Sequence, residues 1–331
     1  MNKFTVVVLL FVLFSCRENT KQTQTLLENT KISGPVFGTS FSVIYNSEIN
    51  YTKQFDSLFA VVNQSMSTYL PDSDISKLNR NEIVEMDQHF VNVYSASKKI
   101  YKATDGAFDP TIGDVVNAWS FGADKNKFLT DSTTINNLMS FVGFDKVMMI
   151  DKIVHKQPQT YIEFNAIAKG YGVDVIADFL ESKNISNYLV EIGGEIRASG
   201  MNMEKGTPWR VGLDEPRFDG EQSVLKGISL SNAGMATSGT YRKFKTDDNG
   251  NRYAHIINTK TGYPTKTNIL SVSVIAEDCM TADAYATAFQ AMGIEKVTEF
   301  LIPHPDLKVF LVFENENKEL ETLNLNDFPE N

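Results

Sequence analysis

The feature that most constrains the fold is an alanine-rich segment near the C-terminus, Thr281–Ala288 (TADAYATA). It follows an alternating apolar run, Ile269 to Ala276, which predicts a strand, and it closes at Gly293. Alanine favours a helix, Thr281 or Asp278 can cap its start, and glycine commonly ends helices. The segment therefore predicts a strand that runs into a helix.

The faces of this predicted helix differ. Ala282, Ala286 and Phe289 fall on one stripe, which we expect to be buried. Asp283 and Thr287, four residues apart, stack on another face near the N-terminus. A carboxylate beside a hydroxyl suits a hard cation that prefers oxygen ligands, such as Mg²⁺. Because Asp in a first turn often only offsets the helix dipole, and Thr often bonds back to its own helix, a purely local interpretation stays open.

The N-terminus reads as a targeting segment. Lys3 is followed by an eleven-residue apolar run, 4–14, which is too short to span a bilayer but has the length of a signal-peptide core. The run ends in LFSC, which resembles a bacterial lipobox with Cys16 as the lipidated residue; a plain signal peptide or an uncleaved anchor is the alternative. We expect a signal peptide over 1–15, lipidated Cys16 and a flexible tether over 16–33, and a folded domain over 34–331. The protein would then be a bacterial cell-membrane lipoprotein facing the periplasm, on the inner membrane in preference to the outer.

Charge and cysteine content exclude several classes of function. The formal net charge is −10 over 331 residues, and no Lys- or Arg-rich run counters it, which argues against nucleic acid as a partner. An acidic protein that handles phosphates needs a cation. The only cysteine besides Cys16 is Cys279, so no cysteine cluster for zinc exists, and Cys279 is best explained as a small packed residue.

Two segments in the middle of the chain predict a turn at a strand end. Thr160–Phe164 reads as a strand that runs through small residues into a helix starting near Lys169. Such a helix start can bind an anion, but the glycine spacing fits neither a P-loop nor a dinucleotide-binding fingerprint, so packing is the alternative. Tyr188–Ile192 reads as a strand that continues over Glu195–Arg197 after a diglycine break.

Three further segments are predicted to be loops or turns. A helix ends at Pro71 after the polar tip Met66–Tyr69, and Thr104–Gly113 contains Asp-Gly and Asp-Pro pairs. Tyr253–Pro264 reads as a short strand that ends in a turn. It carries His255, and a lone histidine near a strand is usually structural.

In their order and spacing, these segments resemble the ApbE family, the FAD:protein FMN transferases, from about Phe37 to about Gly293. The motifs that carry the resemblance are Gly38-Thr39, Met66–Tyr69 with Pro71–Ser73, Gly106–Thr111, Ala166–Tyr171, Glu191–Gly194, Thr237–Tyr241, His255–Ile257 and Ala282–Ala288. Two segments depart from the family pattern. The chain has EFNA at 163–166 where the family often has Asp-Leu-Gly-Gly, and HIINT at 255–259 in place of His-Ile-Ile-Asp-Pro.

The resemblance implies an α+β fold, with mixed or antiparallel sheets packed by helices and a cleft for FAD as substrate. It implies a Mg²⁺ held by the Ala166 carbonyl, the Asp283 carboxylate and the Thr287 hydroxyl. His255 is our candidate for taking a proton, because the pKa of histidine lies near neutrality. The residues implied to line the flavin nucleotide are Phe37, Ser67, Thr68, Tyr69, Ala107, Phe108, Asp109, Glu163, Lys169 and Ile257.

The expected function is Mg²⁺-dependent transfer of FMN from FAD to a Thr or Ser hydroxyl of a target flavoprotein, releasing AMP. By resemblance, the acceptors would be membrane-bound flavoproteins, such as subunits of a respiratory electron-transfer complex. One alternative is a Mg²⁺-dependent FAD pyrophosphatase that gives FMN and AMP, since only the nucleophile differs. Another is a flavin-binding lipoprotein without catalysis.

Overall fold

The computed structural model describes residues 28–124, 130–241, 244–246 and 252–330. The predicted signal peptide and Cys16 lie outside these ranges. Of the helices within them, none is long and apolar enough to cross a membrane.

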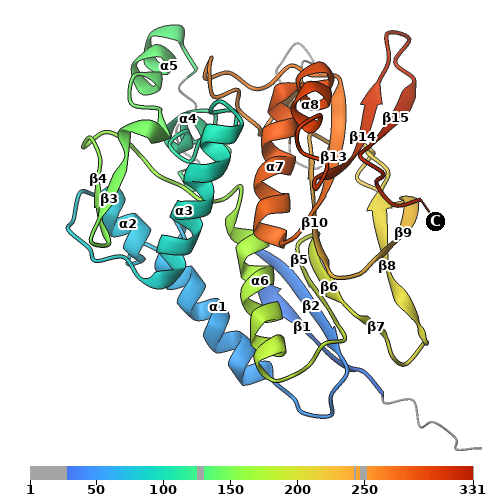
Figure 1. The fold of residues 1–331 in the computed structure, drawn as a ribbon. Helices are drawn as coiled ribbons and strands as arrows, with labels where there is room; N and C mark the ends of the chain where they lie inside the picture. The colour runs from blue at the N-terminus through green and yellow to red at the C-terminus, as the bar shows by residue number, and fades with distance from the viewer. Residues whose placement is uncertain (1–27, 125–129, 242–243, 247–251, 331) are drawn as a thin grey trace, which may run out of the picture.

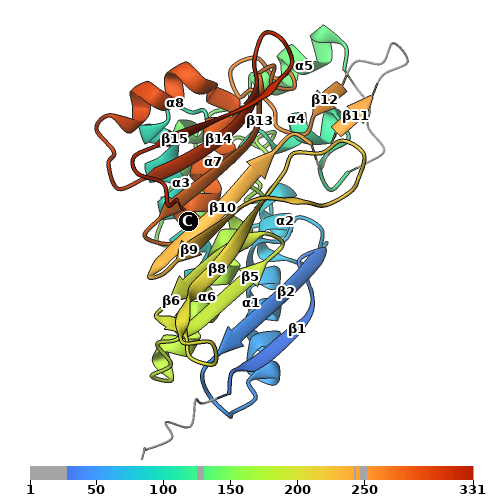
Figure 2. The same ribbon diagram turned by 90° about the vertical axis from the view of Figure 1, so that its right-hand side faces the viewer.

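An eight-stranded antiparallel sheet runs through the molecule in the order β1-β2-β5-β6-β10-β13-β14-β15 (Figures 1 and 2). Its strands are β1 Thr30–Val36, β2 Thr39–Tyr45, β5 Tyr188–Ile192, β6 Glu195–Ser199, β10 Ala233–Gly239, β13 Ile269–Ala276, β14 Lys308–Glu314 and β15 Leu320–Leu325. The N-terminal hairpin thus pairs with the middle of the chain, and β10 joins the middle to the C-terminal strands. This arrangement confirms the predicted α+β fold with antiparallel sheets.

Two helices pack directly on one face of this sheet. Helix α6 (Ala168–Ser182) covers β5 and β6, and α7 (Cys279–Met292) covers β10 and β13 (Figure 1). Helices α1 (Thr52–Met66), α3 (Gln88–Ala103) and α8 (Ile294–Leu301) pack in turn on α6 or α7. The α6 and α7 pair therefore lies between the sheet and an outer helical layer.

Short elements complete the fold. The opposite face of the sheet is covered by β8 and β9, with β7 pairing with β8 (Figure 2). The remaining elements are α2 Asp74–Asn79, α4 Gly113–Ala118, α5 Ser132–Met139, the 3₁₀ turn Phe144–Lys146, β3 Met148–Ile150, β4 Ile153–His155, β7 Met201–Asn202, β8 Thr207–Asp214, β9 Val224–Leu230, β11 Phe244–Thr246 and β12 Arg252–Ala254.

Apolar cores lie on both faces of the sheet, which explains why every residue of β13 is buried. Val272 and Val274 point into the core under the helices, whereas Ile275 packs with Trp209 of β8 on the other face. Ser271 and Ser273 of this strand are buried as well, and the Ser273 hydroxyl lies 2.8 Å from that of Thr237. Strand β13 is therefore covered by packed side chains on both of its faces.

The helix predicted from the alanine-rich segment is confirmed. The Asp278 side chain caps α7 by accepting from the Thr281 N–H at 2.6 Å, and Gly293 ends the helix with φ 85°. Ala282 and Phe289, predicted to be buried, are fully buried.

Several other predictions differ from the structure. Residues 30–33, predicted as tether, belong to β1, because they pair with β2. The predicted strand Thr160–Phe164 reduces to a single bridge between Tyr161 and Ile112. The diglycine does not interrupt a continuing strand: Gly193 and Gly194 have φ 62° and 106° and reverse the chain into the β5–β6 hairpin.

Candidate functional site

The N-terminal turns of α6 and α7 meet in an antiparallel contact. The Gly170 N–H donates to Oδ2 of Asp283 at 3.0 Å. One turn further along α6, Asp174 accepts from the backbone N–H groups of Cys279 and Met280 at 3.0 and 2.8 Å. Because both contacts are spaced by one helical turn on each helix, they fix the register of α7 and the position of Asp283.

Two glycines allow this close approach. A Cβ on Gly170 would lie 2.4 Å from the carbonyl oxygen of Cys279, and a Cβ on Gly234 of β10 would lie 2.3 Å from the backbone of Asp278. The first turn of α7 is therefore wedged between α6 and the sheet. The sequence left two interpretations of the glycine-containing start of this helix, an anion-binding site and close packing. At Gly170 the structure shows close packing.

The junction holds one ammonium and two buried carboxylates. Lys169 Nζ lies 2.5 Å from Oε1 of Glu195, and Glu195 and Asp283 are 3% and 4% exposed. Burial raises the pKa of both carboxyls, and the charge of Lys169 opposes that rise. Burial would lower the pKa of Lys169, but the two carboxylates outweigh it and raise that pKa. Lys169 therefore stays charged at neutral pH, and the junction is one positive charge short when both carboxyls are ionised.

Three oxygens of the predicted cation site fit this deficit. The Gly170 N–H, which has no partner within the first turn of α6, donates to Asp283, and the Ala166 carbonyl just before the helix accepts no hydrogen bond from any described residue. Thr287 Oγ1 lies 3.1 Å from Oγ of Ser238. A carboxylate, a hydroxyl and an uncommitted carbonyl are ligands that suit Mg²⁺.

Most of the residues predicted to line the nucleotide lie in loops and turns that precede α6. The Glu163 N–H donates to the Pro110 carbonyl at 2.9 Å, and Oε2 of Glu163 accepts from the Asn165 amide at 2.8 Å. The Thr259 hydroxyl donates to the Gly106 carbonyl at 2.5 Å. These bonds bring the loop that contains Ala107 and Asp109, the segment around Glu163 and the turn after His255 together.

The tip of α1 faces the same loops. Burial and the charge of Glu163 raise the pKa of Tyr69, whose side chain is still 55% exposed. Thr68 lies beside Tyr161, and Ser67 caps the end of α1 while its carbonyl accepts from the Ser73 hydroxyl at 2.7 Å. Tyr69 is thus an aromatic ring near Glu163 with a free face.

Other predicted nucleotide residues are more enclosed. Phe108 and Ile257 are 3% and 5% exposed, and Oδ1 of Asp109 accepts from both the N–H and the hydroxyl of Thr111. Phe37 occupies the two-residue β1–β2 turn with φ 48° and contacts α6 at Gly172. The ring of Phe108 is therefore placed to support the loop from within the core.

His255 belongs to the loop group. It is half-buried, with its ring edge-on to Phe121 at 6.3 Å. The following turn is anchored by Trp119, whose indole N–H donates to the Gly262 carbonyl at 2.8 Å. This bond fixes the turn that follows the histidine.

Sequence reasoning missed two residues of the junction, Glu195 and Asp174. Each is a carboxylate within an apolar pattern: Asp174 lies between Val173 and Val175 on α6, and Glu195 opens β6 directly after the diglycine. A charged residue on an otherwise apolar face was the available signal, because such a group needs a partner when buried.

Asp174 and Asp178 provide a matched pair of variants, since each lies 3.1 Å from the Arg197 guanidinium but only Asp174 is buried. We expect Asp174→Ala to lower the free energy of unfolding by about 2–4 kcal/mol, because two N–H groups of α7 lose their acceptor. Asp178→Ala should cost about 0.5 kcal/mol or less. Urea unfolding measures both, and equal losses would contradict the positioning role of Asp174.

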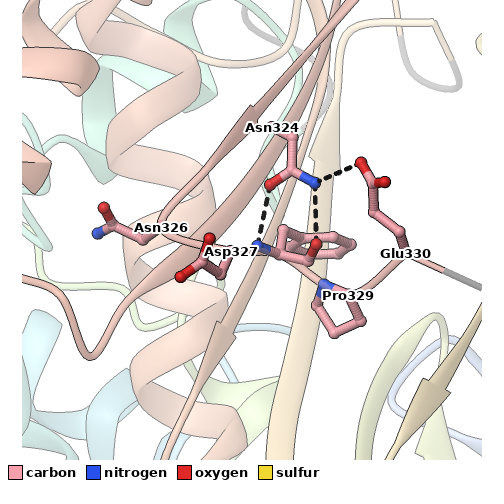
Figure 3. Close-up of a pocket in the computed structure, with 6 residues that line it drawn as sticks. Asn324, Asn326, Asp327, Pro329 and Glu330 are labelled. Carbon is pink, nitrogen blue, oxygen red and sulfur yellow. Dashed lines mark hydrogen bonds between the residues drawn. The ribbon is translucent and has the colours of Figure 1, made fainter.

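A cavity of about 760 Å³ lies elsewhere, at the C-terminal turn (Figure 3). The Asn324 amide donates to the Phe328 carbonyl and to Glu330, and the Phe328 N–H donates back to Asn324. The Phe328 ring is buried against Phe310. The cavity is lined by residues 324 and 326–330, none of which is a predicted site residue, and these bonds make it part of a structural turn.

The known proteins to which this chain is similar belong to one family. Residues 37–311 match the model described as the ApbE family. The chain is 35% identical to the FAD:protein FMN transferase of Haemophilus influenzae over 94% of this chain and 92% of that protein. It is 36% identical to the protein of the same name from Vibrio cholerae, over 81% and 83% of the two chains.

Solved structures agree with this similarity. The flavin transferase ApbE from Vibrio cholerae superposes with a TM-score of 0.81 at 32% identity, covering 90% of this chain and 97% of that one. The apo flavinyl transferase ApbE of Pseudomonas stutzeri gives a TM-score of 0.79 at 27% identity, over 90% and 94%.

Proposed function

The chain belongs to the ApbE family and is a flavin transferase, and we propose that it moves FMN from FAD to a Thr or Ser hydroxyl of an acceptor flavoprotein in a Mg²⁺-dependent reaction. The observation that supports cation dependence is the α6–α7 junction, where the Ala166 carbonyl lacks a donor beside the buried Asp283 carboxylate.

Asp283, Thr287 and the Ala166 carbonyl would hold the cation. When bound, it would neutralise charge on the pyrophosphate oxygens of FAD. Lys169 would bind the same pyrophosphate, because Glu195 fixes its ammonium and its pKa stays high. Its charge opposes the negative charge that builds up as the bond to AMP breaks.

In the transfer step, the acceptor hydroxyl oxygen attacks the phosphorus on the FMN side, and the bond from that phosphorus to the bridging oxygen breaks. AMP leaves with the bridging oxygen, and the hydroxyl proton passes to His255. Tyr69 would pack against a flavin or adenine ring, because its side chain is exposed to solvent and lies near Glu163.

Replacing His255 with alanine should lower the rate of FMN transfer by about 10²-fold or more, because the hydroxyl loses its proton acceptor. FAD affinity should change little. His155→Ala, at an exposed position in β4, is the matched control and should retain full activity. Single-turnover kinetics measures the effect, and an unchanged rate in the His255 variant would remove this residue from the mechanism.

The products separate this function from its alternatives. A transferase releases AMP in proportion to labelled acceptor, whereas a pyrophosphatase releases AMP and free FMN without any acceptor. A flavin-binding protein without catalysis leaves FAD intact. Chromatography of the nucleotides, with and without acceptor, tests all three, and retention of flavin on the denatured acceptor identifies transfer.

We also propose, from residues outside the described ranges, that lipid on Cys16 anchors the domain to the membrane facing the periplasm. Anchoring would place the site near membrane-bound acceptor flavoproteins, such as subunits of an electron-transfer complex. Incorporation of labelled palmitate that is lost in Cys16→Ser tests the anchor, and labelling that persists in this variant would refute it.

A further inference from the structure

Glu195 lies on the helix-covered face of the sheet. It opens β6 and pairs across the hairpin with Ile192, whose side chain contacts the start of α6 near Gly172. Residues paired across a hairpin share a face, and neighbours along a strand alternate. Glu195 therefore points towards α6 and α7, whereas Glu191 points to the opposite face.

The two carboxylate oxygens of Glu195 have different surroundings. Oε1 pairs with Lys169 at 2.5 Å, but Oε2 is buried and has no hydrogen-bond partner among the described residues. Glu195 as a whole is only 3% exposed. A buried carboxylate oxygen is rarely left without a partner, and an orphan of this kind indicates a water or ion in the working protein.

A salt bridge to Lys169 alone does not explain this arrangement. An ion pair at the protein surface would leave Oε2 in water, whereas here the oxygen is enclosed in the junction that also holds Asp283. Asp283 has no proton to donate when it is ionised. While Asp283 is ionised, as a metal ligand is, the missing partner of Oε2 is a donor that neither side chain supplies.

We propose that Glu195 is a positioning residue of the cation site. Its Oε2 accepts a hydrogen bond from a water bound to the divalent cation that Asp283, Thr287 and Ala166 hold, while Oε1 directs Lys169 towards the pyrophosphate. The inference rests on the proposed function. It adds a residue outside the predicted site that links the metal to the phosphate-binding lysine.

The electrostatics support this assignment. When both carboxyls of the junction are ionised, they face one ammonium, and a divalent cation then turns the excess negative charge into an excess positive one. That sign suits an anionic pyrophosphate. Groups that hydrogen-bond to metal ligands from the outer shell commonly change metal affinity 10–100-fold when they are removed.

Mn²⁺ binding to the purified full-length chain without FAD tests the proposal. Electron paramagnetic resonance titrations give the affinity, and thermal melts confirm that each variant is folded. Glu195→Gln should weaken Mn²⁺ binding by about 10-fold or more. Glu195→Asp should also weaken it by about 5-fold or more, because the shorter side chain cannot reach both Lys169 and the water. Glu191→Gln, on the opposite face, should bind Mn²⁺ like the wild type.

The outcomes separate this inference from the proposed function. Wild-type affinity in Glu195→Gln would overturn the role of Glu195 while leaving the cation site intact, provided that Asp283→Ala still abolishes binding. Full recovery in Glu195→Asp would reduce the role to charge alone and would overturn the positioning claim. If the wild-type chain itself binds no Mn²⁺, both the cation site and this inference fail.

Discussion

Asp283→Ala is expected to reduce FMN transfer by about 10³-fold or more, because it removes the one carboxylate among the predicted metal ligands, and a catalytic metal supplies several kcal/mol of charge stabilisation. The loss should occur without unfolding. Burial raises the pKa of Asp283, so the fold gains little from this charge, and the variant leaves a single N–H, that of Gly170, without its acceptor.

Initial rates of acceptor labelling over a range of Mg²⁺ concentrations measure this effect, with a thermal melt as the control for folding. Thr287→Ser retains the hydroxyl and should lose far less activity than Thr287→Val. Full activity in Asp283→Ala would refute the metal assignment. Rates that do not depend on the Mg²⁺ concentration in any variant would refute it as well.

Gly170→Ala is expected to damage both stability and activity. Its Cβ would lie 2.4 Å from the Cys279 carbonyl and 2.8 Å from Cβ of Asp283, so α6 and α7 have to separate. We expect a loss of about 3 kcal/mol in the free energy of unfolding, from overpacking and from the broken hydrogen bond to Asp283. The folded fraction should transfer FMN about 10²-fold more slowly, because a small displacement of a catalytic group is costly.

Gly227→Ala is the matched control for this variant. Gly227 lies in β9, where an added Cβ meets only the end of the Arg210 side chain at 3.2 Å. Its stability should change by about 0.5 kcal/mol or less. Urea unfolding of both variants makes the comparison, and similar small changes at the two positions would show that the α6–α7 contact is loose.

The local part of the site could be predicted from the sequence. The alanine-rich segment, its cap at Asp278 and its end at Gly293 depend on propensities that act over a few residues. The one-turn spacing of Asp283 and Thr287 follows from helix geometry. The family resemblance added Lys169 and Ala166, which the structure places at the start of the neighbouring helix.

The rest depends on contacts between distant segments. Asp283 looked like a residue on a second, more polar face, yet it is 4% exposed because α6, more than a hundred residues earlier, covers it. The diglycine at Gly193 predicts a break within one strand and not a hairpin, because a glycine pair indicates irregular backbone without giving its direction. Glu195 was missed for the same reason: only the reversal brings it under Lys169.

The intact mass of the acceptor shows whether this chain transfers FMN to a protein and whether the transfer needs a metal. The full-length chain is incubated with FAD and an acceptor domain that has an exposed Thr, in Mg²⁺ or in EDTA. We predict that the acceptor gains the mass of one FMN only in Mg²⁺, and that Asp283→Ala abolishes the gain. An equal gain in EDTA would refute the metal dependence, and release of FMN and AMP with an unmodified acceptor would refute transfer to a protein.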